Sequence, residues 1–591
     1  MPEGSQIYSE EALAEALSNA LNHGGRASEG AVLGRLIARH PELRPRIALL
    51  ASEATKAVQR VNKMTTEEQA KVLSSISVKP LEPKHKDTGT RALPEIPGRP
   101  SEVVTRFAPN PDGPLHLGNL RAAVLSHEYA RKYAGRFILR FEDTDPRTKT
   151  PMKEAYEWIK EDLDWLGIKW DEFHFQSDRF DIYYGYARRL IELNGAYVCS
   201  CSKEKFLIYK ETKRACPHRI RKDSGEIFEK MVSGDIGEGD AVVRLTTSMS
   251  DPNPALRDPP LLRVIDSRAH PHPRLGSKYS VFPLYNFSAA VDDSLMGITL
   301  IFRGKEHQVN SIIQTSIQKK LNLTIPVSVQ YGRLKLEGLI LSKSKIRKAL
   351  TSGEFSDGLS GNHMGWDDPR LGTVMALRRR GFDPRTFIEL MIEVGPKPTE
   401  ATISWDNLAG INRRFIEPLA KRFFAVFEPS VLRVTNVSGP GITARVPIHP
   451  SKPDLGSRII EISADSGQID VHVASSDVGL IKERELFRLM DLMNARYTGA
   501  DGYAQTARYE KGSPSEVKAA GGPIIQWVSA TNSVKAVLYK AEGTALRTLE
   551  GMAEKALAEE AVGAEVQLVR LGYARIDSNS EGKVTLVYTH D

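Results

Sequence analysis

The sequence predicts a multidomain α/β protein whose central domain is a parallel sheet covered by helices. First, 591 residues are more than one hydrophobic core can organise, so three to five domains are expected. Second, strand-like apolar runs alternate with helical spacing from residue 101 onward. Third, a purely helical stretch precedes this region and short β-rich runs follow it, which indicates an N-terminal helical domain and C-terminal β-barrels.

Composition is that of a globular protein outside the membrane. The 81 Lys and Arg against 74 Asp and Glu give a net charge of +7, which permits a polyanionic partner without requiring one. No apolar run approaches the length of a membrane span, and the acidic start is not a signal peptide. Three cysteines in so long a chain argue against a disulfide framework, so we expect a reducing, cytoplasmic location.

The first 78 residues read as helices only. Ser9-Glu10-Glu11 and Thr65-Thr66-Glu67-Glu68 are typical helix starts, and leucines recur at helical spacing after the first of them. Such a stripe usually forms a core, so it is assigned no chemistry. Residues 79–100 are rich in Pro, Lys and Gly and predict a linker.

The central region begins with a strand, a turn and a helix. Residues 103–107 predict a buried strand, three prolines and a glycine predict a turn, and residues 119–125 have helical spacing. A helix N-terminus after such a turn favours phosphate, and His116 and Gly118 lie where a phosphate would bind. The alternative is an ordinary strand-to-helix turn with a solvent-facing histidine.

A second buried strand is expected at residues 137–141. Glu142-Asp143-Thr144-Asp145 follows at its carboxyl end, where ligands bind in open parallel sheets. The alternative is a capping box or an acidic turn that binds no metal. A helix is expected over residues 154–166.

Between about residues 190 and 280 the pattern becomes irregular, as in an inserted domain. This window contains all three cysteines, Cys199, Cys201 and Cys216, beside His218. Thiolates and an imidazole suit a tetrahedral zinc ion, although Cys-x-Cys is tighter than the usual spacing. The alternative is three free thiols and a surface histidine.

The central sheet is expected to resume near Val281–Tyr285. A strand at about residues 298–304 then delivers Arg303 to the sheet's carboxyl edge, where a guanidinium could bind a carboxylate bidentately. The alternative for Arg303 is a structural ion pair. Downstream, Leu341–Lys345 predicts a lysine and serine loop, and Met375–Gly381 predicts a basic helix with a glycine cap, either a solvated face or a phosphate contact.

These motifs together resemble the class I aminoacyl-tRNA synthetases. His116-Leu117-Gly118-Asn119 is similar to the HIGH signature, and Ile340-Leu341-Ser342-Lys343-Ser344 is similar to KMSKS. Arg106–Gly113 and Leu139–Asp145 resemble the glutamyl-tRNA synthetases of archaeal type. Asn119 and Ile340 depart from the two signatures and are interpreted as family variation.

The resemblance implies a Rossmann-type catalytic domain that activates L-glutamate with ATP and Mg²⁺ and transfers it to the terminal adenosine of tRNA(Glu). It implies catalytic roles for His116, Gly118 and Lys343. It implies that ATP is bound by His116, Gly118, Asn119, Glu306, Ser342, Lys343 and Ser344. It implies that glutamate is bound by Arg106, Glu142, Tyr285 and Arg303, and that the insert holds the tRNA acceptor end beside a structural Zn²⁺.

The expected domains follow the chain in order. They are a helical domain (1–78), a linker (79–100), the first catalytic half (101–190), the insert (191–280), the second catalytic half with the lysine loop (281–350), a helical stem-contact region (351–428) and an anticodon-binding β-barrel region (429–591). We expect a monomer without membrane contact, and glutamylation of tRNA(Gln) is left open. A glutaminyl-tRNA synthetase and a non-catalytic tRNA-binding relative are the alternatives.

Overall fold

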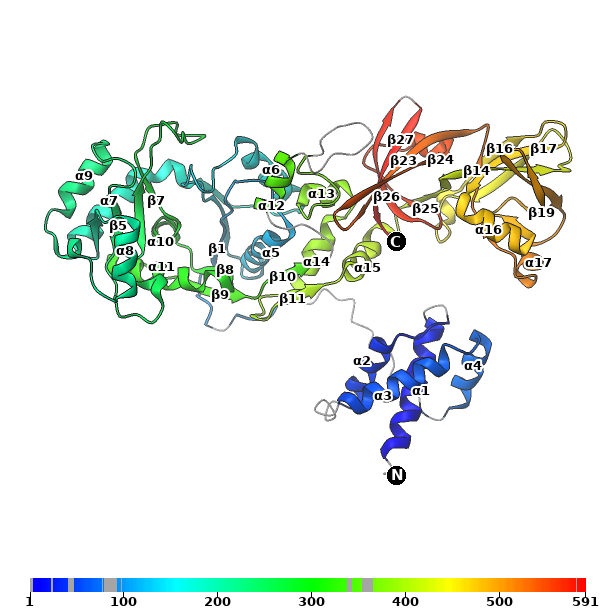
Figure 1. The fold of residues 1–591 in the computed structure, drawn as a ribbon, viewed down its shortest axis with the longest axis horizontal. Helices are drawn as coiled ribbons and strands as arrows, with labels where there is room; N and C mark the ends of the chain where they lie inside the picture. Colours follow the sequence, from blue (N-terminus) through cyan, green and yellow to red (C-terminus); the bar gives the residue numbers. More distant parts are fainter. Residues whose placement is uncertain are drawn as a thin grey trace. The chain divides into compact units, whose positions relative to one another are not determined.

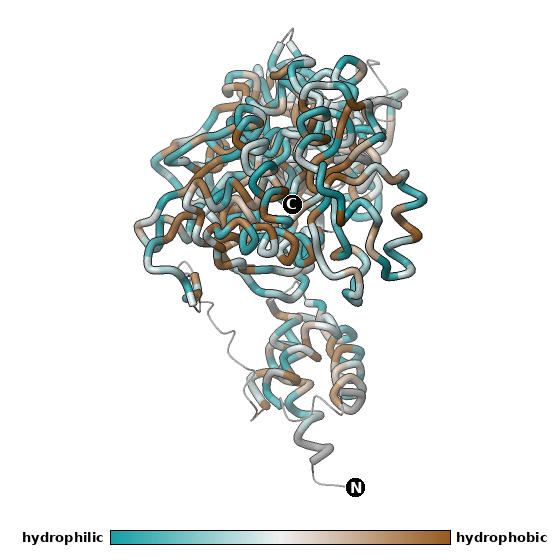
Figure 2. The backbone as a smooth tube through the Cα atoms, turned by 90° about the vertical axis from the view of Figure 1, so that its left-hand side faces the viewer, coloured by the Kyte–Doolittle hydropathy of each residue, from teal (hydrophilic) through white to brown (hydrophobic). Residues whose placement is uncertain are grey.

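The computed structural model describes residues 4–22, 25–40, 47–76, 78, 93–96, 98–336, 343–352, 365–580 and 582–591. The chain divides into two units, Met1–Arg91 and Ala92–Asp591, each with its own apolar core (Figure 1). In the described part, no helix combines the length and the apolar content that a membrane span requires. Accordingly, hydrophobic stretches along the tube in Figure 2 are short and alternate with hydrophilic ones.

In its described part the first unit consists of the helices α1 (Gly4–Asn22), α2 (Glu29–Arg39), α3 (Ile47–Val61) and α4 (Thr66–Ser75). Thr65 caps α4 as predicted, because its Oγ1 accepts the N–H of Glu68 while the Glu68 carboxylate accepts the N–H of Thr65. The prediction that Ser9 starts the first helix is wrong, since α1 begins at Gly4. Glu11 forms an ion pair with Arg39 of α2 at 3.4 Å.

The α/β core of the second unit is a parallel sheet in two parts. One part has the order β1 (Val104–Phe107), β2 (Arg136–Phe141) and β3 (Glu172–Phe175), and the other pairs β8 (Leu300–Gly304) with β9 (Val327–Tyr331). The two parts meet where the N–H of Thr299 donates to the carbonyl of Val104 at 2.9 Å. The predicted buried strands therefore exist, and the predicted α/β class is confirmed.

This arrangement makes the β1–β8 boundary a topological switch point. From β1 the chain proceeds to β2 and β3 on one side, whereas β8 and β9 lie on the other side. Ligands of open α/β sheets bind beyond the carboxyl ends of the strands at such a point. The connecting helices are α5 (Leu117–Lys132), α6 (Lys153–Trp165), α10 (Tyr285–Leu295) and α11 (Gln308–Leu321).

An antiparallel domain is inserted between β3 and β8. Its elements are α7 (Phe180–Glu192), β4 (Ala196–Cys199), α8 (Lys203–Glu211), α9 (Ser224–Ser233), β5 (Val242–Leu245), β6 (Pro260–Val264) and β7 (Val281–Pro283). The expectation that the central sheet resumes at Val281 is wrong, because β7 pairs with β6 of the insert. A short apolar run does not reveal which sheet a strand joins.

A mixed segment connects the core to the C-terminal region. It contains β10 (Leu334–Leu336), α12 (Lys343–Ser352), α13 (Val374–Arg379), α14 (Pro384–Val394), β11 (Ala401–Ile403) and α15 (Trp405–Ile416). The strands β10 and β11 pair in parallel, although one precedes the lysine loop and the other follows α14. Residues 337–342 and 353–364 lie outside the described residues.

The C-terminal region forms two barrel-like sheets, as predicted (Figure 1). The proximal sheet has the order β12 (Lys421–Phe423), β25 (Glu565–Leu568), β26 (Gly572–Ser580), β27 (Lys583–His590), β23 (Ser533–Glu542), β24 (Ala545–Glu554) and β13 (Ala425–Phe427). The distal sheet has the order β21 (Ile524–Ile525), β18 (Leu486–Leu489), β19 (Met493–Asp501), β20 (Ala504–Glu510), β14 (Pro429–Thr435), β17 (Gln468–Ala474) and β22 (Val528–Ser529). Beside them lie the hairpin β15 (Gly441–Pro447) and β16 (Ser457–Ser463), and the helices α16 (Ser475–Arg484) and α17 (Pro514–Ala519).

The basic helix α13 holds the proximal sheet instead of presenting only a solvated face. Arg379 donates to both carboxylate oxygens of Asp577 at 2.9 and 2.7 Å. Arg380 is buried and donates to the carbonyls of Pro369 and Thr589, and burial lowers the pKa of Arg380 to about 10. Arg379, the last residue of α13, and its C-cap Arg380 therefore join the core to the C-terminal region.

Replacing Arg380 with alanine should weaken this junction. The change leaves two buried carbonyls without their donor and creates a cavity, so we expect a loss of about 2–3 kcal/mol and a lower calorimetric melting temperature. Arg378→Ala is the control, because that side chain is only half-buried. Equal melting temperatures for the two variants would contradict the role given to Arg380.

Candidate active site

The turn before α5 is held by a segment that lies far away in the sequence. The N–H of Leu117 donates to the carbonyl of Gly372 at 3.0 Å, and the N–H of Val374 donates to the carbonyl of Leu115 at 2.9 Å. Arg347 of α12 donates to the carbonyl of Asp112 in the same turn. The prediction of a loop over Leu341–Lys345 is wrong for Lys343–Lys345, because α12 begins at Lys343. This helix therefore lies against the turn that carries His116.

His116 is the N-cap of α5, and its imidazole is oriented by the helix that it caps. Its Nδ1 accepts the N–H of Gly118 at 3.0 Å, so the neutral ring carries its hydrogen on Nε2. Asn119 completes a capping box by accepting the N–H of His116 at 3.1 Å. The result is an Nε2–H donor at a helix N-terminus, which is a favourable place for an anion.

Gly118 is required for a reason that the sequence did not reveal. A Cβ at this position would lie 2.9 Å from Cε1 and 3.0 Å from Nδ1 of His116. The glycine therefore makes room for the imidazole.

Three arginines from three strands surround one buried carboxylate. Asp293 of α10 lies 3.1 Å from Nε of Arg106, 2.8 Å from Nη2 of Arg140 and 3.9 Å from Nη2 of Arg303. These four residues are at least 94 % buried and are called the arginine cluster below. Burial by itself would raise the pKa of Asp293, but the guanidiniums of Arg106, Arg140 and Arg303 outweigh it and hold that pKa at about 2.

Glu142 and Tyr285 extend this cluster. Glu142 accepts from Nη2 of Arg140 at 3.2 Å, and burial raises the pKa of its carboxyl against the opposing effect of Arg140 and Arg106. Tyr285 begins α10, and burial also raises the pKa of its hydroxyl, which interacts electrostatically with Glu142 and the arginines. The structure thus brings together all four residues that the resemblance assigned to glutamate.

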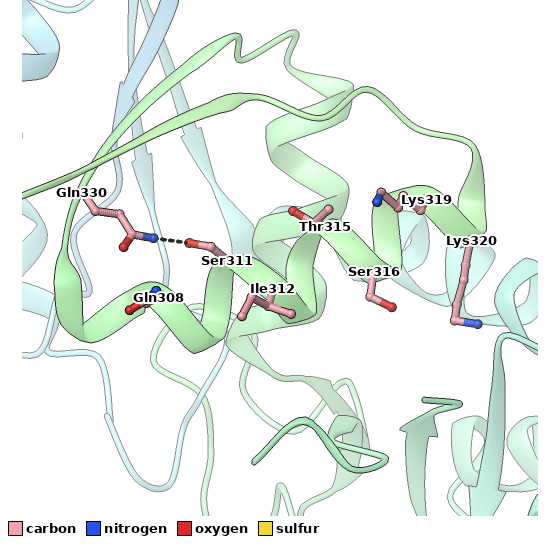
Figure 3. Close-up of a pocket in the computed structure, with 8 residues that line it drawn as sticks. All are labelled: Gln308, Ser311, Ile312, Thr315, Ser316, Lys319, Lys320 and Gln330. Atoms are coloured by element: carbon pink, nitrogen blue, oxygen red, sulfur yellow. Dashed lines mark hydrogen bonds between the residues drawn. The ribbon is translucent and has the colours of Figure 1, made fainter. Parts of the chain in front are cut away.

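Arg303 is held from behind by α11. Its Nη1 donates to Oε1 of Gln314 at 2.8 Å and to Oγ of Ser311 at 3.2 Å, while its buried Nε has no hydrogen-bond partner among the described residues. Ser311 also accepts from Gln330 at 3.3 Å and lines a hollow of about 680 Å³ on α11 (Figure 3). The alternative for Arg303 was a structural ion pair. The one carboxylate among the described residues that forms such a pair with it is Asp293, whose Oδ2 lies 3.9 Å from Nη2 of Arg303.

The other acidic residues after β2 fasten neighbouring elements. Asp143 accepts from the N–H of Ser177 and the hydroxyl of Tyr156, both at 2.8 Å. Asp145 accepts from Arg263 of the insert at 2.9 Å. Of the three carboxylates in this turn, only Glu142 joins the arginine cluster.

Not every predicted site residue meets the arginine cluster. Glu306 follows β8 directly in η5 (Lys305–His307) and lies 3.9 Å from Arg333. Ser342 lies outside the described residues, and so do the side chains of Lys343 and Ser344, whose backbone begins α12.

Sequence reasoning missed Asp293 and Arg140. The available signal was the pair Asp292-Asp293 directly after the apolar run Ala289-Ala290-Val291, since buried carboxylates need charged partners.

The three cysteines and His218 converge in the insert. Sγ of Cys216 lies 3.6 Å from that of Cys199 and 3.4 Å from that of Cys201, and Nδ1 of His218 lies 3.4–3.8 Å from the three sulfurs. These spacings are too long for a disulfide. Thiolates bound tetrahedrally at about 2.3 Å from zinc would be separated by about 3.8 Å, so donor set and spacing both fit zinc.

Comparison with known proteins gives a family for the whole second unit. The model of "tRNA synthetases class I (E and Q), catalytic domain" matches residues 102–418, and two models of the anti-codon binding domain of the same synthetases match residues 420–510 and 524–577.

Curated relatives match almost the entire chain. Glutamate--tRNA ligases of Hyperthermus butylicus and Thermococcus kodakarensis are each 44% identical, over 97% of this chain and 100% and 98% of their own lengths. That of Pyrococcus horikoshii is 43% identical over 98% of this chain and 99% of its own length. A crystal structure of a glutamate tRNA ligase from Elizabethkingia meningosepticum is far more distant, with a TM-score of 0.38 and 20% identity over 54% of this chain and 70% of that one.

Gly118→Ala should displace the imidazole without unfolding the protein. A shift of the Nε2–H donor by a few tenths of an ångström or more should lower the rate of ATP-dependent activation roughly 10- to 100-fold, while the melting temperature is maintained. The control is Gly185→Ala in α7, where a Cβ meets nothing within 4 Å. Unchanged activation by the Gly118 variant would show that the position of the imidazole is unimportant.

Proposed function

The chain belongs to the class I tRNA synthetases for glutamate and glutamine, and we propose that its arginine cluster binds L-glutamate beside an ATP held at the turn before α5. The archaeal relatives that this chain matches over nearly their whole length are glutamate--tRNA ligases, and this chain shares that function. In the first step the α-carboxylate of glutamate attacks the α-phosphorus of ATP and releases pyrophosphate. In the second step the terminal adenosine of tRNA attacks the activated carbonyl.

The charge of the arginine cluster is the observation that carries the proposed substrate. With Glu142 included, three guanidiniums face two carboxylates, so one positive charge remains uncompensated in a buried place. L-glutamate carries one net negative charge at neutral pH and would balance it. Glutamine carries no net charge, so with glutamine bound the remaining positive charge would stay unpaired. Leaving a buried charge unpaired costs several kcal/mol. The cluster therefore favours the acid over the amide.

The two outer arginines of the cluster and the two residues that extend it have separate roles in this proposal. Arg106 and Arg303 bind the side-chain carboxylate, which would also give the buried Nε of Arg303 an acceptor. Glu142 accepts from the ammonium group, and Tyr285 closes the amino-acid side of the site. Binding at fixed groups orients the α-carboxylate for an in-line attack.

The nucleotide is proposed to bind along the turn and the lysine loop. Nε2–H of His116 donates to the α-phosphate as negative charge develops, and Gly118 and Asn119 support it by holding the imidazole and its backbone in place. Glu306, Ser342, Lys343 and Ser344 are the further ATP residues, and the contact of Arg347 with the turn supports this pairing. ATP enters as its Mg²⁺ complex, which neutralises part of the phosphate charge.

The two alternatives are weaker. A glutamine enzyme would bury the uncompensated positive charge described above. A non-catalytic relative would have no need for an imidazole with its hydrogen directed by Gly118. The relatives' names support the glutamate reading as well.

The partner of the reaction is tRNA(Glu), and the C-terminal sheets belong to the matched anticodon-binding domains. Glutamylation of tRNA(Gln) stays open, and a monomer in the cytoplasm is part of the proposal. The acceptor end is proposed to lie on the insert, whose Cys199, Cys201, Cys216 and His218 would hold a structural Zn²⁺. That ion would cross-link β4 to the segment after α8 and take no part in the reaction.

Pyrophosphate exchange tests the proposed substrate. With purified protein and tRNA(Glu), we expect exchange of labelled pyrophosphate into ATP with L-glutamate and at least 100-fold less with L-glutamine, because the amide leaves a buried charge unpaired. Omitting tRNA should weaken the exchange. Equal exchange with both amino acids would overturn the charge argument, and no exchange with either would overturn the enzymatic reading.

Elemental analysis tests the zinc proposal. Protein purified from zinc-supplemented cells should contain about one zinc per chain. Cys216→Ser should lose the metal and melt at a lower temperature, because the ion would cross-link β4 to the segment after α8. Ser200→Ala, between two of the cysteines but exposed, is the control and should keep its zinc. Wild-type protein without zinc would refute the site.

A further inference from the structure

Asp293 is placed where it can control the whole glutamate site. It lies on α10 with 1% of its surface exposed, and its carboxylate reaches guanidiniums from β1, β2 and β8. Oδ1 accepts from Nε of Arg106 at 3.1 Å and lies 2.8 Å from Nη2 of Arg140. Oδ2 lies 3.5 Å from Nη2 of Arg106 and 3.9 Å from Nη2 of Arg303.

Without this carboxylate the three arginines could not keep their arrangement. The guanidiniums of Arg106, Arg140 and Arg303 repel one another, and burial strengthens this repulsion because little water screens it. Glu142 forms an ion pair with Arg140 at 3.2 Å and acts on Arg106 and Arg303 only electrostatically, without such a pair. For Arg106, Asp293 supplies both of the carboxylate oxygens that accept its hydrogen bonds.

The neighbouring residue Asp292 has a different task. It is equally buried, but its carboxylate accepts from Arg179 at 2.8 Å, from Gln176 at 3.0 Å and from Tyr183 at 2.6 Å. These partners lie in η2 (Gln176–Arg179) and α7, so Asp292 fastens α10 to the insert. One helix thus presents two buried carboxylates, one toward the insert and one toward the arginine cluster.

From this contrast we infer that Asp293 is the positioning residue that sets the preference for glutamate over glutamine. It aims Arg106 and Arg303 toward a shared carboxylate, and it leaves one positive charge for the substrate to balance. Asp293 itself does not touch the reacting atoms. The inference rests on the proposed function, because it assumes that glutamate binds at the arginine cluster.

Asp293→Asn tests this role with nearly unchanged volume. An amide can accept from one guanidinium, but its NH₂ group faces another, so Arg106 and Arg303 lose their common alignment. We expect KM for glutamate to rise roughly 10- to 100-fold while KM for ATP stays within about twofold. The ratio of kcat/KM for glutamate to that for glutamine should fall, because only the side-chain carboxylate of glutamate uses the aligned guanidiniums of Arg106 and Arg303. A rise in this ratio would mean that the added positive charge of the variant outweighs the alignment, and it would overturn the inference.

Asp292→Asn is the matched control. It removes an equally buried charge from the same helix, so any general effect of destabilising α10 appears in both variants. KM for glutamate should change less than about threefold in this control. Equal effects of the two substitutions, or an unchanged glutamate-to-glutamine ratio in Asp293→Asn, would overturn the inference.

Asp293→Gly with added formate is the second variant, in case the asparagine protein folds poorly. Formate supplies a carboxylate of the same charge to the vacated space, so KM for glutamate should fall toward the wild-type value. Chloride at the same ionic strength should have no such effect, and failure of formate to act on the folded variant would overturn the inference. If wild-type protein itself shows no exchange with glutamate, the proposed function fails instead.

Discussion

The buried ion cluster around Asp293 is the interaction on which the candidate active site depends. Guanidiniums from β1, β2 and β8 repel one another, and they share the end of one sheet because α10 inserts a carboxylate among them. Breaking a buried pair of this kind costs several kcal/mol, so the charges define where each strand end can lie. The three positive charges are only partly balanced by Asp293 and Glu142, so one acidic ligand can balance the charge that remains.

The rest of the second unit brings the nucleotide side of the site to this cluster. The turn that carries His116 is paired with the backbone around Thr373, and α12 contacts the same turn through Arg347. From there α13 continues to Arg379 and Arg380, which bind the proximal C-terminal sheet. The helix α13 therefore contacts both the turn that carries His116, through Val374, and the proximal C-terminal sheet, through Arg379.

The sequence predicted features that depend on neighbouring residues. It did not predict features that depend on a contact with a distant part of the chain. The capping box at Thr65 and the strands near Arg106 and Arg303 were predicted, because spacing and apolar runs are readable along the chain. The prediction that the strand at Val281 belongs to the central sheet was wrong, because an apolar run does not show which strand it pairs with. The sequence predicts that the arginines near the end of α13 face solvent or phosphate. It does not predict the ion pair with Asp577, because that residue is 198 positions away from Arg379 in the chain.

By itself the sequence determined the α/β class, the strands that carry Arg106 and Arg303, the family resemblance and the identity of most residues proposed for the site. The tertiary structure alone decided that Arg106, Arg140 and Arg303 meet, that Asp293 binds them, and that Gly118 yields its space to His116. The reason is physical. Helix and strand preferences act over a few residues, whereas burial and charge pairing act between groups that are 187 positions apart in the chain and become neighbours only when the sheet forms.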